Sequence, residues 1–395
     1  MRPILAACVL AALLGACRSG DGVPAVARKP ASGAKFAGSF GGAPGAAASA
    51  GQQALRFKKF SYVDQQGIGR EAFSLLVPAD WRFTGGIRWA LDCPAMPAVL
   101  AFKMTKPDGA AEFEIFPNRM FSWTTDPTVQ SMFPAGSRYL GAEVQPPVGA
   151  AEYLQRMLVR PRRGQAVGLQ VVETTPLPEL ARALAGQAPP IPGATATTDA
   201  ARIRIEYQQG GVPMEEDIYA VLQFVHIPFQ GLYGVMTNTI WTADQQFSFK
   251  ARQGDLEAAT KMFQTMAFSF RLDLQWFNKY NQLVQQLTQN QIKQIESIGQ
   301  LSRYISRTND EISTMIRDSY EKQQATYDRL SSNFSQYIRG VDQYYDPIQE
   351  KPVELPSGYR EAWTNPLGEY IVSDDPNYNP NIGSNASWQR LNKKD

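Results

Sequence analysis

The side chains that most often carry enzyme chemistry are scarce in this sequence of 395 residues. It contains one histidine, His226, and only one cysteine, Cys93, outside the first seventeen residues. A zinc site, a Ser-His-Asp triad or a Cys-His pair needs histidine within reach of its partners. We therefore predict no catalytic residue, no metal site and no cofactor. His226 is predicted to be structural, and Cys93 to be a small buried apolar residue.

Two charged runs are the remaining candidates for chemistry. Glu215, Glu216 and Asp217 follow one another in a predicted hairpin, where carboxylates can bind calcium or transfer protons. Residues 160–163 read Arg-Pro-Arg-Arg and could contact anionic polymers or lipid headgroups. Both runs are nevertheless predicted to be solvated surface turns. No glycine-rich phosphate loop accompanies them.

The N-terminus has the parts of a secretory signal. Arg2 precedes an apolar run from Ile4 to Leu14, which is too short to cross a bilayer as a helix. The run ends in Leu14-Gly15-Ala16-Cys17, which resembles the lipobox of bacterial lipoproteins. The resemblance implies removal of residues 1–16 and acylation of Cys17, with palmitate among the expected fatty acids.

This lipobox resemblance also predicts where the protein lies. Several acyl chains on Cys17 would anchor it stably, so the membrane is one expected partner. Arg18, in place of aspartate, implies an anchor in the outer membrane, with the chain facing the periplasm or the cell surface. The alternative is an ordinary secretory signal that carries a cysteine by chance.

Composition suits an exported, folded body. Apolar residues make up 44% of the chain and charged residues 19%, and the formal net charge is +2. No basic patch suggests nucleic acid, and we expect no such partner. Residues 17–54 are rich in Gly, Ala and Ser, which predicts a flexible tether behind the acylated cysteine.

Residues 55–272 are predicted to form a β-rich α+β body. Short β-type runs alternate with turn residues, and the clearest hairpin joins residues 99–105 and 111–116 across Pro107-Asp108-Gly109. Residues 232–242 and 246–251 are predicted to form another hairpin. The sheet is expected to be antiparallel.

A flanking helix is predicted at residues 256–270, where apolar residues recur at spacings of three and four and Asp255 is the expected N-cap. A predicted strand ends at Pro78 and is followed by Trp81, then by the Pro-Asp-Gly hairpin, and then by this closing helix. The order of these elements is similar to that of the PsbP-like α/β/α sandwich. The resemblance implies a binding or scaffolding domain and transfers no catalytic residue.

A long helix is predicted at residues 273–345. No proline interrupts it, and apolar residues repeat every seven positions. Two seams begin at Phe277 and Tyr280, and the first continues through Ile298, Ile305 and Ile312. This pattern predicts a coiled-coil-like rod, and self-association or a protein partner through residues 274–345. The alternative is one helix, or two hinged near Gly299, folded back on the body.

Residues 346–395 are predicted to form a small ordered module of β-strands and loops, because turn residues alternate with aromatic ones. Candidate interaction residues are Tyr359, Trp363, Tyr370, Tyr378 and Trp388. They could stack on glycans, contact a protein or pack internally.

The sequence therefore predicts a non-catalytic, lipid-anchored protein of the bacterial envelope that acts in assembly or partner binding through its body and rod. One alternative is a hydrolase of envelope polymers that uses carboxylates the sequence does not identify. Another is a periplasmic carrier, for which a large apolar pocket with converging polar groups would be the sign.

Overall fold

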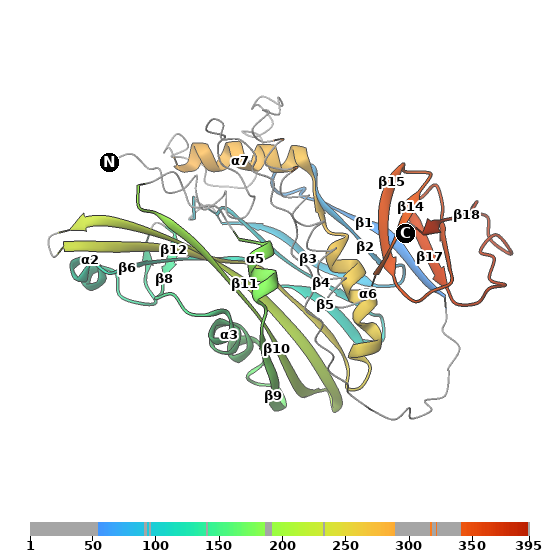
Figure 1. Ribbon diagram of the computed structural model, residues 1–395, viewed down its shortest axis with the longest axis horizontal. Coiled ribbons are helices and arrows are strands. Elements are labelled where there is room, and N and C mark those ends of the chain that lie inside the picture. The colour runs from blue at the N-terminus through green and yellow to red at the C-terminus, as the bar shows by residue number, and fades with distance from the viewer. Residues whose placement is uncertain are drawn as a thin grey trace, which may run out of the picture.

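The computed structural model describes residues 54–90, 93–94, 96–139, 141–185, 192–231, 234–288 and 341–393, together with Arg317 and Glu321. The signal peptide, Cys17 and nearly all of the predicted tether lie outside these residues. Strands account for 51% of the described part and helices for 19%. Three sheets organise it, and their strands pair antiparallel except for β6 and β8, which pair in parallel (Figure 1).

The largest sheet has ten strands, and its long central strands are β10, β11 and β12. Seven strands follow one another in space: β3 (Arg82–Trp89), β4 (Ala98–Thr105), β5 (Ala111–Ile115), β12 (Gly234–Arg252), β11 (Val212–Gly231), β10 (Thr195–Gln209) and β9 (Val167–Pro176). Three more branch from β12: β6 (Arg119–Thr124), β8 (Ala142–Val144) and β7 (Arg138–Tyr139). The expected hairpin across Pro107-Asp108-Gly109 is formed by β4 and β5.

A six-stranded sheet joins the two ends of the described chain. Its strands in spatial order are β13 (Arg271–Leu272), β2 (Glu71–Pro78), β1 (Leu55–Val63), β17 (Glu369–Ser373), β16 (Glu361–Thr364) and β18 (Gln389–Arg390). Because β1 pairs with β17, with Leu55 opposite Val372, the C-terminal strands continue the sheet of the body.

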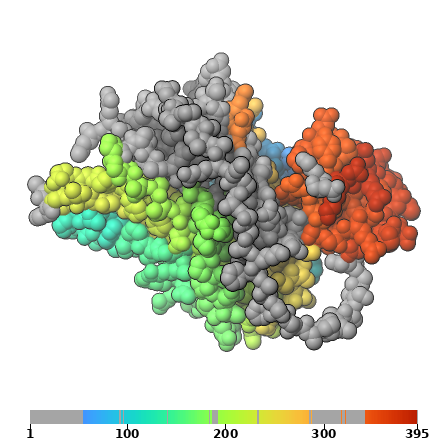
Figure 2. Space-filling view, viewed as in Figure 1, coloured from blue at the N-terminus to red at the C-terminus, as the bar shows by residue number. Residues whose placement is uncertain are grey.

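The third sheet contains β15 (Lys351–Pro356), β14 (Val341–Asp346) and β19 (Asn392–Lys393). It packs with β1 through a separate small core that includes Phe57, Leu355 and Tyr370. In Figure 2 the strands after residue 341 form the red lobe at one end of the molecule.

Helix α6 (Leu256–Phe268) lies between the C-terminal strands and the ten-stranded sheet (Figure 1). Its Phe263 and Met266 are fully buried in the main core. Asp255 is the N-cap residue, but its side chain makes no capping hydrogen bond. Instead, the carboxylate of Glu215, on β11, accepts from the backbone N–H of Leu256 at 2.8 Å and thereby fastens the helix start to the sheet.

A short helical run covers the opposite face of the ten-stranded sheet. It consists of α3 (Ala150–Glu152), the π-helical η1 (Tyr153–Val159) and α4 (Arg160–Arg163). Tyr153 and Leu154 are buried there against sheet residues such as Trp241. The remaining short helices are α2 (Pro127–Met132) and α5 (Pro178–Ala183). No described helix is both long and apolar enough to cross a bilayer.

The predicted coiled-coil rod is wrong for the residues that the structure describes. The first part of the stretch is α7 (Leu274–Thr288), a helix of 15 residues, and the last part is a β-strand, β14. The apolar face of α7, including Phe277, Leu283 and Val284, is buried in the core of the body. Ile298, Ile305 and Ile312 lie outside the described residues.

A buried carboxylate holds α7 against the body. Asp64 is 0% exposed and accepts from the indole N–H of Trp276, on α7, at 3.0 Å and from that of Trp89, on β3, at 3.2 Å. The backbone N–H groups of Gly67 and Ile68 donate to the same carboxylate. Docking of α7 therefore supplies one of the four hydrogen-bond donors to this buried carboxylate, which helps to hold the helix against the body.

Replacing Trp276 with Phe should lower the free energy of unfolding by about 1–3 kcal/mol, because it removes one hydrogen bond from a buried charge. Urea unfolding followed by circular dichroism measures the change. Trp363→Phe is the matched control, since the Trp363 indole N–H is buried without a partner. Equal losses in the two variants would contradict the role assigned to Asp64.

Candidate functional site

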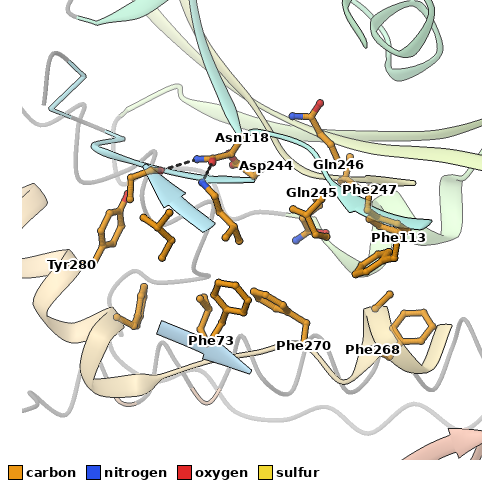
Figure 3. A pocket seen from close by; sticks show the side chains of 18 of the residues that line it. Phe73, Phe113, Asn118, Asp244, Gln245, Gln246, Phe247, Phe268, Phe270 and Tyr280 are labelled. Carbon is orange, nitrogen blue, oxygen red and sulfur yellow. Dashed lines mark hydrogen bonds between the residues drawn. The ribbon is translucent and has the colours of Figure 1, made fainter. Parts of the chain in front are cut away.

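A cavity of about 200 Å³ lies inside the body, between the ten-stranded sheet and a wall made of β2, β13, α6 and α7. Its lining is mostly apolar and aromatic. The sheet contributes Ile87, Leu100, Phe113, Ile115 and Phe247, and the opposite wall contributes Phe73, Ala267, Phe268, Phe270, Leu272, Trp276, Phe277 and Tyr280. We call it the core cavity. Figure 3 shows aromatic side chains gathered on the wall that faces the sheet.

Asp244 is the one charged residue among the described residues that line the core cavity. It lies at a bulge in β12, because Val221 of β11 pairs with Gln245 and the next residue, Leu222, pairs with Ala243. Asp244 is thus the additional residue of β12 that has no pairing partner on β11. The strand that pairs with the other edge of β12 also changes here: β6 pairs with the residues before Asp244, and β5 pairs with residues after it.

The bulge reverses which side chains of β12 face the cavity. Before it, Trp241 and Ala243 belong to the core on the α3 side of the sheet, whereas Phe249, after it, belongs to the core on the cavity side. A regular strand would keep odd-numbered residues on one face. Bulges commonly redirect a side chain next to a functional site. This one brings a carboxylate to an apolar cavity.

The Asp244 carboxylate has no hydrogen-bond partner among the described residues. Both oxygens are buried, although the residue as a whole is partly exposed. Burial raises the pKa of Asp244 to about 7 because it disfavours the charged form, and the nearby Thr242 hydroxyl acts in the opposite direction without reaching hydrogen-bond geometry. An unpartnered buried carboxylate is costly, which makes Asp244 a candidate for ligand binding.

Two of the side-chain amides at the cavity are already engaged. Asn118 accepts from the backbone N–H of Leu100 at 2.9 Å and donates to the carbonyl of Ala98 at 3.2 Å (Figure 3). Gln246 accepts from Tyr153 and donates to two backbone carbonyls. Because their bonds hold these two amides in place, the lining groups with capacity for a ligand are the Asp244 carboxylate and the neighbouring Gln245 amide.

Tyr280 closes the cavity from α7. Burial raises the pKa of its hydroxyl, and the charges of Asp244 and Cys93 raise it further. The phenol therefore stays protonated at neutral pH and lies near both groups. The arrangement can bind and orient a small molecule, but the carboxylate has neither a histidine nor a second carboxylate beside it in the lining.

The structure places His226 and Cys93 in different surroundings. The imidazole of His226 contacts the hydroxyl of Thr239 at 3.0 Å and that of Thr197 at 3.5 Å, as expected for a structural residue. Cys93 is buried near Tyr280. Among the described residues, no group of His, Cys, Asp or Glu side chains could hold a metal ion.

The prediction of a solvated turn is wrong for the acidic run, which is buried, whereas in the basic run only Arg163 is partly buried and the other three residues are exposed. Arg163, at the end of α4, donates to Glu216 at 2.9 Å and to Glu114 at 2.8 Å, and Glu216 is 0% exposed. Lys250 pairs with Glu112 at 2.9 Å beside them. These charges join α4 to the sheet on the face opposite the core cavity, which indicates a structural role.

The other two acidic residues are engaged as well. Glu215 caps α6, and Asp217 makes a bidentate ion pair with Arg204 at 2.7 Å. A stretch of three acidic residues in sequence is therefore divided between three structural tasks, because successive side chains of a strand point to opposite faces.

The aromatic residues of the C-terminal region pack within the protein. Tyr370 is buried and donates to the buried carboxylate of Asp346 at 2.6 Å. Trp388 is buried, and Tyr359, Trp363 and Tyr378 are half-buried. The structure brings none of these candidate interaction residues to the core cavity.

A search against known protein families finds no match, and a search among curated proteins finds none either. The site is therefore interpreted from its own geometry. The lipobox and PsbP-like resemblances stay predictions. Asp244 was not among the candidate residues predicted from the sequence.

Replacing Asp244 with Asn should change how the stability of the ligand-free protein depends on pH. An unfolded aspartate ionises near pH 3.8, whereas the folded one ionises near pH 7. The wild type should lose stability relative to Asp244→Asn as pH rises from about 4 to 7, by about 2–4 kcal/mol in total, with no further change above that range. Urea unfolding at several pH values measures it, and a constant difference would contradict the raised pKa.

Arg163→Met should destabilise the protein by about 3–5 kcal/mol at pH 7, because Glu216 would be left buried without its cation. Desolvation raises the pKa of Glu216, but the hydrogen bonds and charge of Arg163 hold it below its usual value. Arg156→Met is the control. Its ion pair with Glu152 is exposed, so a loss within about 0.5 kcal/mol is expected from denaturant titration. A small loss for Arg163→Met would refute the structural role of the network.

Proposed function

We propose that this chain is a non-catalytic binding protein of the bacterial envelope that carries a small, mainly apolar ligand in the core cavity. The observation that carries the proposal is a half-open apolar space in the body with an unpartnered carboxylate at its lining. Ligand sites in proteins usually combine apolar walls with a few placed polar groups. The core cavity has both features.

The size of the cavity limits the ligand. A dry cavity of about 150 Å³ accommodates benzene. The core cavity, at about 200 Å³, suits one or two aromatic rings, or the end of a short aliphatic chain. A ligand of that size would replace contacts that the surrounding side chains otherwise lack.

The remaining parts of the proposal rest on the sequence. The lipobox at Leu14-Gly15-Ala16-Cys17 supports an acyl anchor on Cys17 in the outer membrane, and the residues behind it support a flexible tether. A carrier held in this way would work close to the membrane. Assembly through a coiled coil loses its support with the burial of α7.

Filling the cavity should abolish binding. Ala267, on α6, lines the cavity, so Ala267→Phe should weaken binding of naphthalene, a neutral apolar probe, by at least about tenfold, as calorimetric titration would show. Ala258→Phe places the same ring on the exposed face of the same helix and should leave binding unchanged.

Circular dichroism would establish that both variants keep the wild-type fold. If wild-type protein fails to bind naphthalene, or if Ala267→Phe binds it as well as wild type, the carrier proposal is overturned.

A further inference from the structure

The charge of the core cavity is unbalanced. Asp244 is the one residue among the described lining residues that can carry a charge near neutral pH, and neither of its oxygens has a partner. An ionised carboxylate in such surroundings accepts hydrogen bonds and offers none. Its desolvation is costly unless a donor or a cation reaches it.

The groups that face Asp244 do not supply that cation. Tyr280 lines the cavity, and its hydroxyl cannot carry a positive charge. Across the sheet lie Tyr153, which is hydrogen-bonded to Gln246, and Arg119.

Arg119 is already committed. Its guanidinium pairs with Glu143, donates to the carbonyl of Met157 and lies over the ring of Phe121 at 4.8 Å. It does not contribute to the shifted pKa of Asp244, whose causes are burial and Thr242. The negative charge is therefore left for a ligand to neutralise.

We propose that the core cavity selects amphipathic amines: the protonated amino group meets the Asp244 carboxylate, and the apolar part lies among Phe73, Phe270 and Trp276. This inference rests on the proposed function and adds the charge of the ligand to it. An ammonium group can donate to both oxygens at once and form a charge-assisted pair, which is stronger than a neutral hydrogen bond.

The aromatic lining favours the same ligand. The faces of Tyr280 and Trp276 attract cations through their ring quadrupoles, most strongly where water is excluded. The two rings line the cavity and stack at 5.3 Å between centroids, which fixes their positions on its α7 side. A carboxylate ligand would instead meet an uncompensated like charge.

Three probes of similar size and different charge test the inference. The dissociation constants of 2-phenylethylamine, 2-phenylethanol and phenylacetate are measured by calorimetry at pH 8 with the wild-type chain and with Asp244→Asn. The wild type should bind the amine at least about tenfold more tightly than the alcohol, and phenylacetate at least about tenfold more weakly than the alcohol.

In Asp244→Asn, the amine should lose about 10-fold to 100-fold in affinity, whereas the alcohol should change by less than about threefold. Retained alcohol binding shows that the variant is folded. Because the wild-type carboxyl is protonated at low pH, its preference for the amine should shrink between pH 8 and pH 5.

The possible results separate the two proposals. If the alcohol binds in the cavity but the amine has no advantage, or if Asp244→Asn leaves the amine affinity unchanged, the amine inference is overturned and the carrier proposal stands. If none of the three probes binds the wild type, both are overturned.

Discussion

The carboxylate of Asp64 is the constraint on which the interior of this protein depends. It is fully buried, and two indole N–H groups and two backbone N–H groups from separate segments converge on it. Such a charge is tolerable only when all its donors are in place. Because Trp276 is one of them, Asp64 fixes the start of α7, and with it the wall that carries Trp276, Phe277 and Tyr280 into the core cavity.

Three of the buried carboxylates described above, those of Asp64, Glu216 and Asp244, differ in how far their charge is compensated. Asp64 is satisfied by hydrogen bonds, and Glu216 by Arg163 and Tyr207. Asp244 has neither, and burial raises its pKa accordingly. A fold that satisfies carboxylates such as those of Asp64 and Glu216 and leaves Asp244 open at a cavity supports a role for Asp244 outside stability, since functional sites are where such costs are retained.

Local pattern predicted the Pro-Asp-Gly hairpin and the helix that begins at Leu256, because turn chemistry and a period of 3.6 residues are local signals. The pattern also predicted the helix of α7 but not its burial in the body. Between Phe277 and Leu287, the apolar seam of a coiled coil and the apolar face of an ordinary helix diverge by only about 20° per heptad, so the two cannot be distinguished over so short a stretch. The pattern failed at residues 243–245, where the break in the strand pattern was interpreted as a turn. The break is the bulge at Asp244 within one long strand, and only the pairing with β11 reveals it.

Methyl NMR of the full chain with naphthalene tests the central claim, that the space between the sheet and α7 is a ligand site, most directly. The account predicts intermolecular nuclear Overhauser effects from the methyl groups of Ile87 and Leu100, which line the core cavity. Effects confined to exposed methyl groups, such as those of Val167 and Ile382, would contradict it.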